Sequence, residues 1–298
     1  MTRFQANAML LGAGAIWGMG FVAQSTAMED LPPFVFLTLR FIIAFLVILP
    51  FAIFEARKSE VKLKISEWNA FLIIGVFLFG GMSAQQVGLL TTTVTNSGFL
   101  TGLYVVFTPI LGVILFRAWP HPIVWPAACI AMVGIFFLAG GQLHGLVIGD
   151  WFTILCALCW ALQVLFIARW VGASGRPITL AVTQFAICAV LAFIFAASFE
   201  QFTWAAVTPA IPELIFTGVF SSGVAFTLQA VGQQHTTAPQ AAIFLSSETL
   251  FAALFAALIL SERLGMAAIA GCLLIFAAML ITELGPIVQM RRRLKLTT

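Results

Sequence analysis

The sequence has few charged residues. Asp, Glu, Lys and Arg make up only 8% of the 298 residues, whereas soluble domains contain roughly 25%. Apolar residues make up 62% of the chain, and its mean hydropathy is +1.09. This composition excludes a water-soluble globular domain and predicts a protein whose main solvent is lipid.

Catalytic and nucleotide-binding motifs are also missing. The sequence contains no GxxxxGK[ST] loop for ATP and no HExxH zinc motif. Its three histidines, His121, His144 and His235, fall in loops or near the ends of apolar segments, which disfavours an intramembrane serine protease. We therefore predict that the protein is not an enzyme and that it uses neither a cofactor nor a metal.

Cysteine is scarce, and all five cysteines lie within apolar segments, so no disulfide framework is expected. Cys156 and Cys159 form a CxxC, but no second pair and no histidine accompanies them in the same segment. Packing is therefore favoured over redox or zinc chemistry.

Long apolar segments dominate the rest of the chain. A membrane-spanning helix needs about 20 mostly apolar residues, and backbone polar groups in lipid must be bonded within the protein. Such windows lie at 7–27, 33–54, 68–90, 96–116, 122–140, 150–171, 177–198, 212–234, 240–260 and 266–284. They are about twice as long as the strands of a membrane barrel. We therefore predict an all-α membrane protein with ten transmembrane helices.

The basic residues are distributed unevenly between the predicted loops. With the N-terminus in the cytoplasm, twelve of the fourteen Lys and Arg residues face inward, Arg263 faces outward and Arg40 lies within the second span. The positive-inside rule then predicts ten spans of a cell (inner) membrane protein, with both termini cytoplasmic. The basic tail from Arg291 to Lys295 is interpreted as an anchor to anionic lipid rather than a nucleic-acid site.

The chain also contains a weak internal repeat at an offset of 143 or 144 residues. Trp17 matches Trp160, and further matches keep nearly the same offset through successive spans. Because each half contains an odd number of spans, the two halves enter the membrane from opposite sides, as in many secondary transporters. We predict two inverted five-helix repeats, residues 1–143 and 144–298.

Four segments carry a resemblance to a known family. They are AIWGMGFV at 15–22, LPPFVFLTLRFIIA at 31–44, NSGFLTGLYVVFTPILGVILF at 96–116 and SSETLFAALFAALILSERL at 246–264. With them the chain resembles the drug/metabolite transporter superfamily, and within it the EamA type of ten-span exporters. The resemblance implies two inverted repeats and export of amino acids or other metabolites. It extends, more weakly, to the YddG-like exporters of aromatic amino acids.

One position departs from the pattern of this family. Thr249 follows Glu248 in the ninth span, where many members have a proline. The sequence therefore gives no reason for a proline break in this span, whereas Pro109 predicts one in the fourth.

Two charges lie deep within the predicted spans, where charge is costly and marks a functional candidate. Arg40 lies about seven residues into the second span, and Glu248 lies about eight residues into the ninth. Either the two side chains pair across the bundle, or Glu248 couples transport by binding a proton or a cation. A purely structural charge is the alternative for each.

Polar and aromatic residues recur at helical spacing in four predicted spans, and polar side chains in lipid face the bundle interior or a watery cavity. We predict that they line one central substrate-binding cavity, with simple interhelical bonding as the alternative. They are Phe79, Ser83 and Gln86 in the third span, Thr101, Tyr104 and Thr108 in the fourth, Ser222, Phe226 and Gln229 in the eighth, and Ser247 and Glu248 in the ninth.

Trp17 and Trp160 lie well inside the first and sixth spans, away from the interfaces where tryptophan usually gathers. An indole ring offers a large apolar face and a single N–H group, which suits stacking on a planar substrate. We predict that both rings line the substrate cavity, with ordinary packing as the alternative.

These features together predict a secondary transporter that exports small organic metabolites, best matched by amino acids including aromatic ones, through alternating access. One carboxylate among aromatic residues also suits an organic cation, so multidrug export is the main alternative. A channel is less favoured, because selectivity filters usually surround a pore with groups from several subunits. The expected partners are a small-molecule substrate and membrane lipid, without nucleic acid; monomer and homodimer both stay open.

Overall fold

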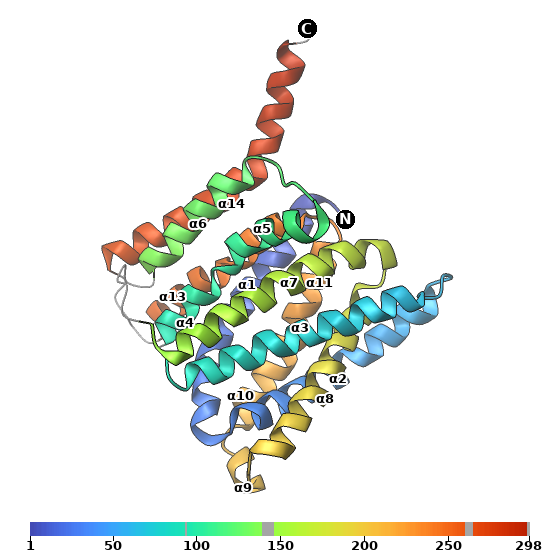
Figure 1. Cartoon of the computed structure of the whole chain (residues 1–298), viewed down its shortest axis with the longest axis vertical. Helices are drawn as coiled ribbons and strands as arrows, with labels where there is room; N and C mark the ends of the chain where they lie inside the picture. Colours follow the sequence, from blue (N-terminus) through green and yellow to red (C-terminus); the bar gives the residue numbers. More distant parts are fainter. Residues whose placement is uncertain (93, 139–145, 260–264, 297–298) are drawn as a thin grey trace.

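The computed structural model describes residues 1–92, 94–138, 146–259 and 265–296. Within these residues every regular element is a helix (Figure 1). The elements are α1 (Arg3–Asp30), α2 (Pro33–Lys58), α3 (Ile65–Leu89), α4 (Val94–Thr101), α5 (Tyr104–Phe116), α6 (Val124–Leu138), α7 (Ile148–Ser174), α8 (Pro177–Phe199), α9 (Trp204–Val207), α10 (Ile211–Ile215), the π-helix η1 (Phe216–Val224), α11 (Ala225–Gln233), α12 (Ala238–Leu245), α13 (Ser247–Ile259) and α14 (Met266–Leu296).

Among the described residues, eight helical stretches are long and apolar enough to cross a membrane, and α6 is a shorter apolar helix of 15 residues. The all-α class predicted from composition agrees with this finding. The number of such helices supports eight of the ten predicted spans. The helix α1, with 28 residues, is not among the eight. The predicted placements of His144 and Arg263 lie outside the described residues. The side chains of the basic tail are likewise not described.

Helices of the first half of the chain pack mainly on helices of the second half. α2 packs on α8, α3 on α7, α6 on α14, and α1 on both α11 and α13. In the repeat, α1 corresponds to α7, α3 corresponds to α11, and α5 corresponds to α13. When each helix is exchanged for its equivalent, the contact of α3 with α7 becomes that of α11 with α1, and the contact of α5 with α7 becomes that of α13 with α1. Both members of each pair of contacts are present. Such an exchange of contacts is expected of two structural repeats that pack on each other.

The antiparallel helices α2 and α8 cap each other at both ends. The carboxylate of Glu200, just after α8, accepts the backbone N–H groups of Phe34 and Val35 at 3.0 and 2.8 Å. Glu55, in the last turn of α2, accepts two N–H groups in the first turn of α8 at 3.0 and 2.7 Å. The first N–H groups of a helix have no partner within it, and the helix dipole favours an anion there. The caps therefore fix α2 and α8 as one pair.

Two of the predicted spans are broken near their middle. In the first half, α4 ends at Thr101 and α5 begins at Tyr104; in the second half, α12 ends at Leu245 and α13 begins at Ser247. The two breaks are 143 to 144 residues apart, which is the offset of the sequence repeat. Broken helices are tolerated at membrane depth only where protein or a cavity satisfies the backbone. The breaks therefore point to the functional centre.

The break between α12 and α13 forms without a proline. The Ser246 hydroxyl donates to the carbonyl of Ile243 at 2.7 Å, and the Thr249 hydroxyl donates to the carbonyl of Ser246 at 2.8 Å. Such bonds from side chains to nearby carbonyls favour a local departure from the helix, and the Ser246 carbonyl also accepts the backbone N–H of Thr249 at 3.2 Å. Pro109, by contrast, lies inside α5, several residues after the break that it was expected to cause. Hydroxyl groups, rather than proline, accompany the break in the second half.

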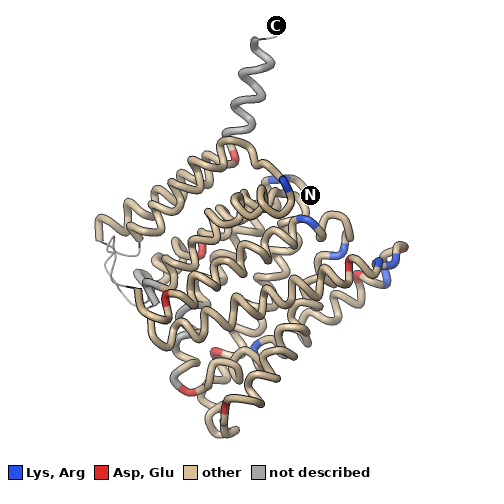
Figure 2. Tube along the Cα trace, viewed as in Figure 1, with Lys and Arg blue, Asp and Glu red and all other residues tan. Residues whose placement is uncertain are grey.

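The basic residues lie toward one side of the bundle. In Figure 2 the described Lys and Arg residues other than Arg40 gather on the side that carries the N-terminus and the connection between α2 and α3, whereas acidic residues lie on both sides. Arg40 lies alone in the interior.

Candidate substrate site

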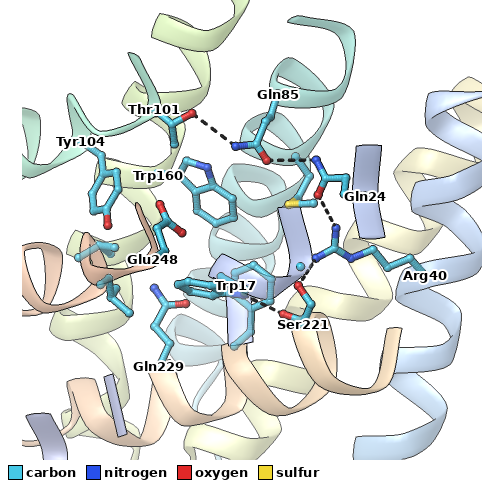
Figure 3. Close-up of a pocket in the computed structure, with 15 residues that line it drawn as sticks. Trp17, Gln24, Arg40, Gln85, Thr101, Tyr104, Trp160, Ser221, Gln229 and Glu248 are labelled. Atoms are coloured by element: carbon cyan, nitrogen blue, oxygen red, sulfur yellow. Dashed lines mark hydrogen bonds between the residues drawn. The ribbon is translucent and has the colours of Figure 1, made fainter. Parts of the chain in front are cut away.

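A polar hollow lies where the broken spans meet α1, α3, α7 and η1 (Figure 3). Its free volume is about 50 Å³, which suffices for a few water molecules at roughly 10–15 Å³ each. An organic solute would therefore require its walls to move apart. The lining residues are Trp17, Gly20, Gln24, Arg40, Met82, Gln85, Thr101, Tyr104, Trp160, Val164, Ser221, Phe226, Gln229, Leu245 and Glu248.

Arg40 occupies one end of the hollow and is held by neutral acceptors. Its Nε donates to the Ser222 hydroxyl at 2.6 Å, Nη1 donates to Gln24 Oε1 at 3.0 Å and Nη2 donates to the Ser221 hydroxyl at 3.0 Å. No ion pair forms with Arg40 among the described residues, where the one recorded ion pair joins Arg3 and Glu283. The side chain is therefore fixed in position while its positive charge stays uncompensated.

A belt of amides continues from Arg40 along one wall of the hollow, as Figure 3 shows. Gln24 Nε2 donates to Gln86 Oε1 and, at 3.5 Å, to Gln85 Oε1. Gln85 Nε2 in turn donates to the Thr101 hydroxyl at 3.4 Å. This belt joins α1, α3 and α4, so a displacement of any of these helices disturbs the partners of Arg40.

Glu248 lies at the other end of the hollow, near Tyr104 (Figure 3). Its side chain is buried, with 9% exposure, and within the described part of the chain no hydrogen bond or ion pair reaches its carboxylate. Tyr104 and Glu248 each follow the break of their own span, at positions related by the repeat. The predicted pairing of Arg40 with Glu248 is not present in this structure.

Three aromatic rings separate the two charged ends. Trp160 stacks on Phe226 at 5.6 Å and an interplanar angle of 18°, and Trp17 lies 4.8 Å from Phe226 and 6.4 Å from Trp160 between ring centroids. Trp17 Nε1 donates to the carbonyl of Ser221 at 2.8 Å. Because this bond uses its only polar atom, Trp17 offers the hollow an apolar ring surface.

The π-helix η1 explains how Ser221 faces both Trp17 and Arg40. A π-helical turn bonds residue i to i+5 and often marks a functional site. In η1 and the following α11 the lining residues are Ser221, Phe226 and Gln229. Ser221 and Phe226 are therefore five residues apart, as in a π-helical turn, rather than four. The equivalent part of α3 is regular α-helix, which makes the two halves different at this point.

The predicted residues separate into two groups. Trp17, Arg40, Thr101, Tyr104, Trp160, Phe226, Gln229 and Glu248 line the hollow. The others do not line it: Phe79, Ser83, Gln86, Thr108, Ser222 and Ser247. Of these, Gln86 and Ser222 support lining residues through hydrogen bonds, and Thr108 donates to the carbonyl of Tyr104.

Sequence reasoning missed several lining residues, of which Gln24, Gln85 and Ser221 carry polar groups. Gln24 was detectable as an amide within an apolar span. Gln85 and Ser221 are the immediate neighbours of the predicted Gln86 and Ser222. A helix wheel shifted by one residue would have found both, but the sequence alone does not fix the rotation of a helix about its axis.

The described residues contain no group of three His, Cys, Asp or Glu side chains that could hold a metal ion. All five cysteines are free, and Cys156 is fully buried while Cys159 is partly buried. This agrees with a packing role for the CxxC.

A bundle of apolar helices that encloses a hollow with one acidic and one basic side chain is the architecture of a membrane transport protein. The chain belongs to the EamA-like transporter family, whose sequence pattern matches residues 5–140 and 147–284. The two matched ranges agree with a two-repeat organisation, and the family suggested by the sequence is confirmed.

A known relative agrees with this family, and a solved structure shares the fold. A protein of Archaeoglobus fulgidus described as an uncharacterized transporter is 35% identical over 286 residues, which cover 95% of this chain and 87% of that protein. A crystal structure of a protein with 18% identity superposes with a TM-score of 0.81 and covers 98% of this chain and 99% of that one. At this identity the structural likeness concerns the fold alone. The family and the relative are transporters, which points away from an enzyme.

Proposed function

We propose that the protein is a secondary transporter that exports small zwitterionic metabolites, best matched by aromatic amino acids, through alternating access. The observation that carries this proposal is the buried Glu248 carboxylate, which faces the hollow without a hydrogen bond or ion pair from the described residues. A buried charge without a partner is strongly destabilising, so such a group is retained where a ligand or a proton completes it.

The side chains around the hollow suit the groups of an aromatic amino acid once its walls move apart. Glu248 would accept its ammonium group, Arg40 would donate to its carboxylate, and the faces of Trp17 and Trp160 would contact its ring. Arg40 uses three of its five N–H groups within the protein, which leaves donors for a carboxylate. An organic cation would use Glu248 and the rings but leave Arg40 unpaired.

Alternating access would follow from the two interlocked halves, each contributing one broken span to the hollow. We propose that the protein crosses the inner membrane ten times and that both termini lie in the cytoplasm. The basic residues gather on one side in Figure 2, which supports this orientation. The direction of transport, export, is what the family resemblance implies.

Labelling of introduced cysteines tests this orientation. Glu60→Cys and Met290→Cys, made separately in a variant without native cysteines, should both react with a membrane-impermeant thiol reagent only after the cytoplasmic face is opened. Reaction of the two positions from opposite faces would contradict the proposed arrangement of the spans.

A transport panel in proteoliposomes tests the substrate class. We expect tryptophan and phenylalanine to move with saturable kinetics, and a quaternary ammonium compound to move much more slowly, because only the zwitterion satisfies both charged ends. Each substrate is measured with and without a pH gradient. Faster movement of the quaternary ammonium than of the amino acids would instead favour multidrug export.

Substitution of Trp17 tests its contact with the substrate. Trp17→Ala should raise the apparent KM for tryptophan roughly tenfold and change the KM for alanine little, since loss of an aromatic contact costs about 0.5–1.5 kcal/mol in addition to the area no longer buried. Trp17→Phe is the matched control: it keeps a ring but loses the bond to Ser221. An equal change in KM for both amino acids would remove Trp17 from ring recognition.

A further inference from the structure

A second cavity lies closer to the basic side of the bundle and shares no lining residue with the hollow. Its volume is about 570 Å³, within the range of roughly 300–1,000 Å³ typical of ligand sites. It lies mainly between the ends of α5 and α7, the start of α12 and the connection from α5 to α6. The transport proposal does not use this space.

Three basic side chains line the second cavity. Arg169 is exposed, and its guanidinium lies over the ring of Phe116 at 5.4 Å. Within the described part of the chain, Arg169 has no hydrogen bond or ion pair. The Nδ1 atom of His121 accepts the N–H of Ile123 at 3.3 Å, so the neutral ring carries its proton on Nε2 as a free donor. Arg3 is the third basic residue.

In the part of the chain that the structure describes, no acidic side chain lines the second cavity, and the carboxylate beside it already has partners. Glu283 Oε2 accepts from Asn7 at 2.7 Å and from Gln240 at 2.8 Å, and it pairs with Arg3 at 3.3 Å. The charge of Arg169 is therefore unbalanced, and the cavity has a net positive charge. A ligand with an ammonium group would find no free acceptor carboxylate here.

The rest of the wall is largely apolar and continues onto a surface of the kind that faces lipid. Phe116 and Leu165 line the interior, and Trp119 lines it while being 76% exposed. Just before Phe116 on α5, Leu115 is 48% exposed. Exposed tryptophan is typical of the level of the lipid headgroups, and exposed aliphatic residues are typical of the acyl-chain region.

From this combination we infer that the second cavity binds the phosphate headgroup of an anionic phospholipid. Arg169 and the Nε2–H of His121 donate to the phosphate, and the acyl chains extend past the exposed Trp119 and Leu115. Basic pockets between membrane helices on the cytoplasmic side are known to take such headgroups. A zwitterionic substrate on its way to the hollow is disfavoured, because its ammonium group would stay unpaired.

Native mass spectrometry of the purified full-length protein tests this site without measuring transport, so its result does not depend on the transport proposal. The probes are phosphatidylglycerol and phosphatidylcholine with identical acyl chains. Arg169→Gln should weaken phosphatidylglycerol binding about five- to tenfold and leave phosphatidylcholine binding unchanged, since one basic residue near an anionic lipid contributes on the order of a fivefold change in affinity. Arg169→Lys should keep part of the preference.

Arg57→Gln is the matched control, because Arg57 is exposed in the last turn of α2 and does not line the cavity. Equal loss of phosphatidylglycerol in Arg57→Gln and Arg169→Gln would overturn the site in favour of general attraction to basic residues. Displacement of the lipid by millimolar inorganic phosphate would show a site for a free anion and overturn the lipid assignment. Displacement by tryptophan would show an entry vestibule and overturn it as well.

Discussion

Glu248→Gln should reduce substrate exchange, or its response to a pH gradient, at least a hundredfold. Glutamine has nearly the shape of glutamate but can neither carry a negative charge nor release a proton, so both roles proposed for Glu248 are lost. The size of the effect follows from the burial of the carboxylate, since breaking an ionic contact inside a protein costs about 3–5 kcal/mol. Initial rates in proteoliposomes, with and without a pH gradient, measure it.

The pattern of loss in this variant separates the two roles. If Glu248 binds the ammonium group of the substrate, exchange itself fails; if it carries the coupling proton, exchange persists and only the response to the gradient fails. Glu283→Gln is the control, because Glu283 is a partly buried carboxylate that three side chains already satisfy. A Glu248→Gln protein with the rate and gradient response of the unmodified protein would remove Glu248 from the site.

Gly18→Ala should destabilise the protein and disturb the hollow, whereas Gly12→Ala should not. A Cβ atom at Gly18 would lie 2.7 Å from the backbone N of Ala252 and the backbone O of Glu248, so α1 and α13 would have to separate. Overpacking of this kind costs typically about 1–3 kcal/mol. At Gly12 the same atom would meet only the side chain of Leu228, at an ordinary 3.7 Å.

Thermal unfolding of the two glycine variants in detergent, followed by tryptophan fluorescence, checks this expectation. We expect Gly18→Ala to melt several degrees below the unmodified protein and to transport more slowly, because the displaced backbone of α13 carries Glu248. Gly12→Ala should melt within about a degree of the unmodified protein. Equal melting temperatures would mean that the contact between α1 and α13 is loose enough to absorb a methyl group.

Features that depend on composition and on the repeat were predictable from the sequence. Lipid as solvent forces helices, and the cost of charge in lipid singles out Arg40 and Glu248. The repeat offset joined Trp17 to Trp160, and both rings line the hollow. These inferences need only the chemistry of a residue and its depth within a span, which sequence spacing supplies.

Features that depend on helix geometry were not predictable in the same way. The π-helix that turns Ser221 toward the hollow has no proline or other marker in the sequence, and the break before Ser247 depends on hydroxyl bonds from Ser246 and Thr249. Glu248 does not pair with Arg40, because three neutral groups hold Arg40 at the far end of the hollow. These features are determined by tertiary packing.

Counterflow of labelled tryptophan is the most direct measurement of the central claim, a single hollow that opens to each side in turn. In proteoliposomes preloaded with unlabelled tryptophan, we expect labelled tryptophan to enter faster than into empty vesicles and to overshoot its equilibrium level. Glu248→Gln vesicles should lack this overshoot if the carboxylate binds the substrate. Uptake by the unmodified protein that rises linearly with concentration and is unaffected by preloading would contradict the account, because it would describe a pore open to both sides at once.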